Sequence, residues 1–229
     1  MQLDLNELKE KGGLLLVDKP VTWTSFDVVN KLRYALKIKK IGHAGTLDPL
    51  ATGLLLIGVG KGTKLLNDLQ GLDKSYTGII ELGKTTASYD MERPFEVEND
   101  TTDVTEEIVS EQIDKLTGVI EQVPPSHSAV KVNGTRAYKL ARQNEEVIIK
   151  KRTVSIHQFD YQLKLPEVIF DIRCSKGTYI RSIANDLGQL VGVGGYLKLL
   201  RRTSVGDYHI KNAWQLDALI DEIQGDGDN

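Results

Sequence analysis

The chain has 229 residues, a formal net charge of −3, four histidines and one cysteine. Its length fits one large domain or two small ones, and a lone cysteine excludes an internal disulfide framework and suits a reducing compartment. No apolar run is long enough to span a bilayer, and the amino terminus lacks the apolar stretch of a signal peptide. We therefore expect a cytoplasmic protein, without a structural zinc site because no Cys/His cluster has ligand spacing.

Basic residues gather in short clusters although the whole chain is acidic. An acidic balance argues mildly against a nucleic-acid partner, but separated charge permits a basic face on an acidic protein. Ordinary solvated surface charge is the alternative. The basic clusters lie at 31–40, 61–64, 150–152 and 201–202, and acidic residues gather in 90–114 and in the C-terminal tail.

The first elements in chain order are a strand and a helix. The stretch GLLLVDKP at 13–20 is typical of a short buried strand closed by proline. The next stretch, 24–37, has Thr24 or Ser25 as a helix cap. Its apolar residues at helical spacing are Phe26, Val29, Leu32 and Leu36.

The stretch GHAGTLDPLATG at 42–53 sets one carboxylate, Asp48, among small residues. Pro49 disfavours the helical region for Asp48, so we expect the aspartate on an extended or turn-like segment. The small residues leave the space that a closely approaching ligand needs. Taken alone, the stretch favours a simpler reading, an Asx-turn in which Asp48 hydrogen-bonds the backbone just ahead of it.

The middle of the chain predicts two strands, two helices and a loop. A buried strand at 53–60 precedes a short helix at 61–71, and 75–83 is strand-like. The polar segment 84–103 predicts a long surface loop. A helix capped by Thr105 is expected at 105–118.

The last third of the chain mixes strands with two helices. Asn133-Gly134 is the strongest hairpin signal in the chain, and alternating apolar residues predict a half-buried strand at 168–175. A helix at 178–190 has Thr178 as its cap and one apolar face. That face holds Ile180, Ile183, Ala184, Leu187 and Leu190, and the remaining elements are strands at 154–165 and 195–210 and a helix at 214–223.

Hairpins alternate with helices here without a repeating βαβ pattern, and no linker divides the chain. We expect an α+β fold with a mixed, mainly antiparallel sheet flanked by helices and loops. The expected organisation is a single domain over residues 1–229.

Six stretches together resemble the tRNA pseudouridine-55 synthase (TruB) family. They occur in the order of the family and cover most of residues 12–206, which leaves 207–229 as a short helix and an acidic tail. Many bacterial members carry a further RNA-binding (PUA-type) domain, which we expect to be absent here. The stretches are LLLVDKPVTWTSFDVV, KIGHAGTLDPLATGLLLIGVGKGTK, KSYTGIIELG, PPSHSAVKVNGTRAYKLAR, CSKGTYIRSIANDLG and LRRTSVG.

The resemblance implies an enzyme that converts uridine 55 in the T-loop of tRNA to pseudouridine after flipping the nucleotide out of its stack. The family uses no cofactor and no metal. The implied partner is the T-arm of tRNA, and we expect a monomer.

The family pattern also implies three catalytic residues. Asp48 matches the nucleophile, and whether it attacks the base or the sugar stays open. Arg181 matches an arginine that pairs with the nucleophile and keeps it ionised; its position alone favours a solvent-facing residue. Tyr179 matches a tyrosine that contacts the target base and assists proton transfer, although a tyrosine at a helix start is usually packing.

The remaining matches imply contacts with RNA or support for the loop. Tyr76 matches an aromatic residue that stacks on the flipped uracil, although a strand tyrosine often lines a core. His43 matches the residue that fills the gap left in the T-loop, and Leu200 one that abuts the target nucleotide. Lys19 and Pro20 match a pair that buttresses the active-site loop.

A T-arm is recognised through its shape, its phosphates and its splayed-out bases. The lysines at 31–40 and 61–64, with Arg201 and Arg202, are candidates for phosphate contacts. Two alternatives stay open: a tRNA-folding chaperone whose modification activity is secondary, and a pseudouridine synthase that acts on another RNA.

Overall fold

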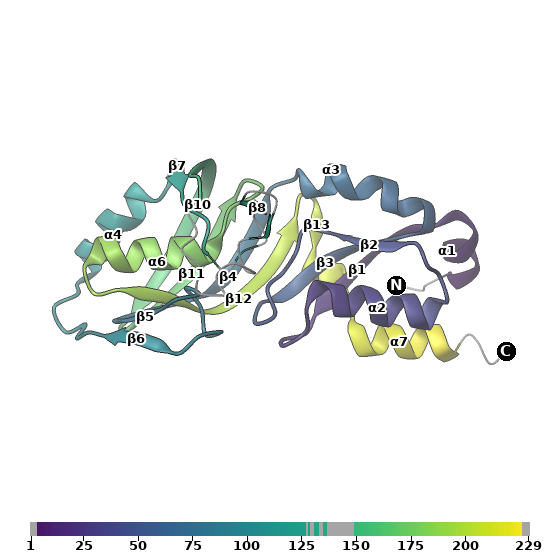
Figure 1. Ribbon diagram of the computed structural model, residues 1–229, viewed down its shortest axis with the longest axis horizontal. Coiled ribbons are helices and arrows are strands. Elements are labelled where there is room, and N and C mark those ends of the chain that lie inside the picture. Colours follow the sequence, from purple (N-terminus) through teal and green to yellow (C-terminus); the bar gives the residue numbers. More distant parts are fainter. Residues whose placement is uncertain (1–3, 127, 129–130, 133–134, 137–148, 226–229) are drawn as a thin grey trace. The chain divides into compact units, whose positions relative to one another are not determined.

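The computed structural model describes residues 4–126, 128, 131–132, 135–136 and 149–225. The chain divides into two compact units, Met1–Tyr76 with Leu200–Asn229 and Thr77–Leu199. The single domain expected over 1–229 stays a prediction. The main sheet is mixed and mainly antiparallel, with helices beside it, so the expected α+β class is confirmed (Figure 1).

The first unit contains the strand order β14-β1-β3-β12, with β2 paired to β3 and β13 paired to β12. The pairs β1–β14 and β3–β12 are parallel, whereas β1–β3 and β2–β3 are antiparallel. Its elements are α1 (Leu5–Lys11), β1 (Gly13–Lys19), α2 (Ser25–Leu36), β2 (Ile41–Ala44), β3 (Thr52–Val59), the 3₁₀ turn η1 (Gly60–Leu65), α3 (Leu66–Gln70), β13 (Tyr208–His209), the 3₁₀ turn η2 (Ile210–Asn212), β14 (Trp214–Gln215) and α7 (Leu216–Gly225).

The second unit continues the strand order as β12-β4-β11-β10-β7. Strands β4 (Lys74–Leu82) and β12 (Gly195–Val205) belong in part to each unit. Helices α4 and α6 lie side by side (Figure 1). The other elements are β5 (Lys84–Thr86), β6 (Phe95–Glu98), α4 (Glu106–Lys115), β7 (Gly118–Gln122), β8 (Lys131–Val132), β9 (Thr135–Arg136), β10 (Arg152–Lys164), β11 (Glu167–Cys174) and α6 (Ile180–Val191).

Strand β3 is buried along almost its whole length because both of its faces are covered. Leu55, Ile57 and Val59 face a core built with residues of α1, α2 and α7. Leu54 and Leu56 face a smaller core with Leu69 and Val205 on the other side. A strand covered on both faces needs a continuous apolar run, so the buried strand predicted at 53–60 is confirmed.

Helix α2 begins with a capping box, in which the Thr24 side chain accepts from the Asp27 N–H and Asp27 accepts from the Thr24 N–H. Thr24 is therefore the cap, as expected. Val29, Leu32 and Leu36 are buried as predicted. Phe26 is 59 % exposed, so its assignment to the apolar face was wrong. It lies one residue after Ser25, which holds the buried position in the first turn, and Val28 is the first apolar residue of α2 in the core.

Two predictions at α6 were also wrong. Tyr179, not Thr178, is the N-cap, and the Thr178 hydroxyl instead donates to the Ser175 carbonyl at 2.9 Å. Leu190 is exposed, because the buried face ends at Leu187 and Gly188. The earlier part of the predicted apolar face is buried as expected.

The surface loop predicted at 84–103 contains the β5–β6 hairpin. Thr86, Ser88 and Asp90 in it are buried, so describing the whole segment as surface loop was wrong. The alternation predicted at 168–175 is confirmed in β11, and Thr105 caps α4. Asn133-Gly134 lies outside the described residues, and β8 pairs with β9 on either side of it.

Replacing Gly53 by alanine should strongly destabilise the first unit. Gly53 has φ of 107°, and a Cβ there would stand 2.3 Å from the Arg202 carbonyl oxygen on β12. We expect Gly53→Ala to lower the free energy of unfolding by about 2–5 kcal/mol in denaturant titrations.

Gly118→Ala is the matched control. Gly118 has φ of 90°, but a Cβ there would meet no atom within 4 Å. It should therefore show only the backbone strain of about 1–2 kcal/mol. Equal losses in the two variants would contradict the close approach of β12 at Gly53.

Candidate active site

The loop that carries Asp48 joins β2 to β3 in the first unit. The Ala51 N–H donates to the Asp48 carbonyl at 3.1 Å, so residues 48–51 form a turn with Pro49 in its second position. The Asp48 side chain is half-buried. The non-helical, turn-like setting predicted for Asp48 is therefore confirmed.

Hydrogen bonds fix the chain on both sides of Asp48. The Ser25 hydroxyl accepts from the Leu47 N–H at 2.9 Å and donates to the Leu47 carbonyl at 3.2 Å. The Pro49 carbonyl accepts from the Thr22 N–H at 2.9 Å. Because Ser25 and Leu47 are also buried, the position of Asp48 follows from the packing of α2 against this loop.

Lys19, at the end of β1, is fully buried beneath the same loop. Its Nζ donates to the carbonyls of Pro20, Trp23 and Pro49 at 2.9, 2.6 and 3.3 Å. Burial lowers the pKa of Lys19 to about 8, although the charge of Asp48 acts in the opposite direction. These bonds tie two loops together, in agreement with the buttressing expected of Lys19 and Pro20.

The space next to the small residues of 42–53 is filled by the protein itself. A Cβ at Gly42 would meet Leu66 at 3.0 Å, and one at Gly45 would meet the Arg202 guanidinium at 3.4 Å. Gly53 faces the backbone of β12, and Ala44 and Ala51 are buried. The interpretation that these residues leave room for a ligand was therefore wrong: they allow close packing of β2, β3 and β12.

His43 lies on β2 opposite Ile57 of β3 and is half-buried. Burial lowers the pKa of His43, and the charge of Arg202 lowers it further. Its imidazole is therefore neutral at pH 7. A neutral imidazole can be inserted among nucleobases with less loss of hydration than a charged one.

The two arginines at 201–202 have partners within the first unit. Arg202 is 1 % exposed, and it donates to the carbonyls of Leu54 at 2.7 Å and Gly45 at 3.1 Å. Including Arg202 among phosphate-binding residues was therefore wrong. Arg201 is partly exposed, but both its Nη atoms bind the Asp18 carboxylate, at 3.1 and 2.6 Å.

Tyr76 and Leu200 lie on strands that form part of the first unit. Tyr76 on β4 is 8 % exposed, as its alternative reading as a core tyrosine requires. Leu200 on β12 is half-buried, and its carbonyl accepts from the Thr52 hydroxyl at 3.4 Å. The stacking role of Tyr76 and the contact role of Leu200 stay predictions.

Arg181 lies in the first turn of α6, in the second unit, and is 3 % exposed. Its Nη1 donates to the Ser88 carbonyl at 3.1 Å and lies 3.6 Å from the Asp90 carboxylate. The solvent-facing alternative for Arg181 is therefore wrong. Sequence reasoning missed Asp90, because it follows a turn at 87–89 and no strand or helix periodicity marks it as buried.

Tyr179 precedes α6 and is half-buried. The Gln122 side-chain amide binds both backbone groups of Tyr179. The Tyr179 N–H donates to Gln122 Oε1 at 2.8 Å, and Gln122 Nε2 donates to the Tyr179 carbonyl at 3.1 Å. The Arg152 guanidinium lies over its ring, 4.3 Å from the centroid. Neither Gln122 nor Arg152 was singled out from the sequence.

The predicted site residues thus fall into two sets. His43, Asp48, Tyr76 and Leu200 belong to the first unit, and Tyr179 and Arg181 to the second. Buried polar side chains bind the backbone beside Asp48 in the first unit and the backbone of Tyr179 in the second. The pairing of Asp48 with Arg181 stays a prediction.

Comparisons with known proteins identify the family. Residues 33–180 match the model of the TruB family pseudouridylate synthase N-terminal domain, and residues 181–228 match the tRNA pseudouridylate synthase B C-terminal domain. A tRNA pseudouridine synthase B of Chlorobaculum tepidum is 49 % identical over 96 % of this chain and 94 % of its own length. The chain belongs to the TruB family.

Other relatives agree with this assignment. A tRNA pseudouridine synthase B of Flavobacterium johnsoniae is 46 % identical over 93 % of this chain and 97 % of its own length. A solved structure of a Cbf5-Nop10-Gar1 complex contains a chain 26 % identical to this one, with a TM-score of 0.73 over 96 % of this chain. This chain spans 56 % of that one. As a TruB-family member, the protein is a pseudouridine synthase, which is an isomerase.

The described residues contain no group of three or more His, Cys, Asp or Glu side chains placed to hold a metal ion. In the same part of the chain, no helix is long and apolar enough to cross a membrane.

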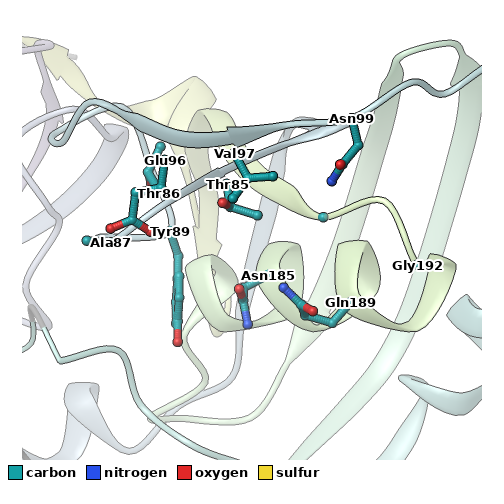
Figure 2. Close-up of a pocket in the computed structure, with 11 residues that line it drawn as sticks. Thr85, Thr86, Ala87, Tyr89, Glu96, Val97, Asn99, Asn185, Gln189 and Gly192 are labelled. Atoms are coloured by element: carbon teal, nitrogen blue, oxygen red, sulfur yellow. The ribbon is translucent and has the colours of Figure 1, made fainter.

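A pocket of about 670 Å³ lies in the second unit of this TruB-family chain, between the β5–β6 hairpin and α6 (Figure 2). Tyr89, Asn185 and Gln189 line it together with residues of the hairpin. Burial raises the pKa of Tyr89, and the nearby Asp186 raises it further. The six predicted site residues do not line this pocket.

Removing the Lys19 ammonium should loosen the turn that carries Asp48. Lys19→Met leaves three carbonyls without this donor, and we expect the free energy of unfolding to fall by about 1–3 kcal/mol in denaturant titrations. Lys11→Met is the control, because the Lys11 side chain is 71 % exposed; it should change stability by less than about 0.5 kcal/mol. A Lys19→Met variant as stable as Lys11→Met would contradict the buttress.

The lowered pKa of His43 should appear in the pH dependence of stability. Between its folded-state pKa and about 6.5, the unfolded chain binds more protons at His43 than the folded chain does. This contribution to stability is complete above about pH 6.5 and is lost as the pH falls through the folded-state value. His43→Gln should therefore flatten the fall in unfolding free energy between about pH 7 and 5, whereas His209→Gln, at an exposed position, should not. An unchanged slope in His43→Gln would contradict the lowered pKa.

Proposed function

We propose that this protein converts uridine 55 in the T-loop of tRNA to pseudouridine, with Asp48 as the nucleophile. The proposal is supported by relatives named tRNA pseudouridine synthase B, one of them 49 % identical over 96 % of the chain. It is also supported by the half-buried Asp48 on a turn whose two flanks are hydrogen-bonded to buried side chains. A tRNA substrate agrees with the cytoplasmic location expected from the sequence.

The reaction breaks the bond between C1′ of the ribose and N1 of uracil and forms a bond from C1′ to C5. C5 loses its proton and N1 gains one, so the product is an isomer of the substrate. The Asp48 carboxylate attacks the base or the sugar and is released when the new bond is complete. A nucleotide inside a folded T-loop has to be flipped out before this can occur.

The carboxylate of Asp48 has to be ionised in a partly dry site to act as a nucleophile. The buried Lys19 ammonium attracts it electrostatically, and in the proposed mechanism Arg181 pairs with it in the complex with RNA. A guanidinium has five N–H donors, so Arg181 can keep its contacts with Ser88 and Asp90 while it binds Asp48. Both cations favour the charged carboxylate.

The remaining predicted residues are assigned to the RNA. Tyr76 stacks on the flipped uracil, a contact worth about 1–3 kcal/mol per base. Tyr179 contacts the same base and assists proton transfer at C5. His43 fills the gap in the T-loop, and Leu200 abuts the target nucleotide.

Phosphate contacts in this proposal come from exposed lysines of the first unit. These are Lys31, Lys37, Lys39, Lys40, Lys61 and Lys64. Binding through such contacts should weaken steeply as salt increases.

The test is pseudouridine formation on an unmodified tRNA transcript, with enzyme in excess. Asp48→Asn should lower the rate by at least about 10³-fold while binding of the transcript is retained. Asp217→Asn, at an exposed position on α7, is the matched control and should match the wild type. Product from Asp48→Asn at the wild-type rate would show that Asp48 is not the nucleophile.

Two further outcomes favour the alternatives. Modification of the transcript at another position, or of another RNA only, would favour a synthase with a different substrate. Binding and faster folding of tRNA by both wild type and Asp48→Asn, without product from either, would favour the chaperone.

A further inference from the structure

Strands β7 and β10 present two side chains to the same tyrosine. Gln122, the last residue of β7, is the direct register partner of Arg152, the first residue of β10. Directly opposed residues of an antiparallel pair point to the same face of the sheet. Both of these side chains contact Tyr179, one at its backbone and the other at its ring.

The Gln122 amide fixes where the Tyr179 backbone lies. It is 0 % exposed, and it binds both the N–H and the carbonyl of Tyr179. Tyr179 is the N-cap of α6 and has no side-chain capping bond there. The Ser182 hydroxyl adds a bond of 2.7 Å to the carbonyl of Val123, which follows Gln122, so the start of the helix is fixed to the end of β7 at two points.

The Arg152 guanidinium fixes the orientation of the Tyr179 ring. Its Nε and Nη2 atoms are buried, and among the described residues they have no hydrogen-bond partner. A guanidinium usually forms several hydrogen bonds. The guanidinium lies over the face of the Tyr179 ring, 4.3 Å from the centroid, and this cation–π contact favours one orientation of the ring.

We infer that Gln122 and Arg152 form a cross-strand pair of positioning residues that aim the Tyr179 side chain at the target base. This inference rests on the proposed function, in which Tyr179 contacts that base. Gln122 fixes the position of the Tyr179 backbone, and Arg152 limits the rotation of the Tyr179 ring. Neither side chain reacts; they act through Tyr179.

A direct role of Arg152 in binding RNA is the competing explanation, and it predicts a different measurement. A phosphate contact contributes to affinity and to the dependence of binding on salt. A positioning residue contributes to the rate of the bound complex. Single-turnover rates at saturating enzyme and dissociation constants for the tRNA therefore separate the two.

The experiment compares wild type, Arg152→Met and Lys151→Met on one tRNA transcript. Lys151→Met is the matched control, because it removes the neighbouring cation. The Lys151 side chain is 66 % exposed and paired with Glu121. Arg152→Met should lower the single-turnover rate by roughly 3- to 30-fold, the equivalent of a cation–π contact, with an unchanged dissociation constant. Lys151→Met should change neither, and Arg152→Lys should recover part of the rate.

A double-mutant cycle with Tyr179→Leu tests whether Arg152 acts through the tyrosine. Conversion is followed for hours with excess enzyme, so that slow variants stay measurable. Arg152→Met should cause no further loss of rate in the Tyr179→Leu background.

Gln122→Met should also lower the single-turnover rate relative to the wild type, at an unchanged dissociation constant. Thermal unfolding is measured on each variant to select those that are folded.

The possible failures are distinguishable. If the wild type makes no pseudouridine in tRNA, the proposed function fails. If it does, the inference is overturned by equal losses from Arg152→Met in both backgrounds, by an effect confined to affinity and its salt dependence, or by a wild-type rate in Arg152→Met.

Discussion

A buried ammonium group supports the turn on which Asp48 lies. The Lys19 side chain is taken out of water and has three backbone carbonyls as partners, and the cost of burying it appears as a pKa lowered to about 8. The attraction between Lys19 and Asp48 favours the charged form of both side chains. The same group that ties the loops together therefore also favours a charged carboxylate, which is the form that a nucleophile needs.

The two units hold their candidate residues with a similar device. In the first unit, the Ser25 hydroxyl binds both the N–H and the carbonyl of Leu47, the residue before Asp48. In the second, the Gln122 amide binds both groups of Tyr179. A buried side chain that satisfies both backbone groups of one residue can fix that residue at the edge of a helix or in a loop. This lets the candidate residues lie where regular structure ends.

The sequence predicted the elements well where a single physical signal decided the outcome. The apolar run of β3 and the alternation of β11 each followed from burial alone. Predictions were wrong where two signals competed. Phe26 had helical spacing, but the buried face of α2 passes through Val28 instead. Small residues around Asp48 suggested room for a ligand, whereas contacts from β12, more than 140 residues away in the chain, fill the space beside Gly45 and Gly53.

Arginine and lysine have different tasks in this chain, and the difference explains how an acidic protein could bind RNA. The described arginines that were expected to meet phosphates or solvent are bound by the protein: Arg202 by carbonyls, Arg201 by Asp18, and Arg181 by Ser88 and Asp90. A planar guanidinium with five donors suits such fixed, partly dry positions. The lysines of 31–40 and 61–64 are exposed instead, and a hydrated ammonium on a flexible stem suits contact with phosphates at variable positions. Counting charges over the whole sequence therefore underestimates the capacity for RNA, because acidic and basic side chains are not spread evenly and the exposed lysines gather in two short segments.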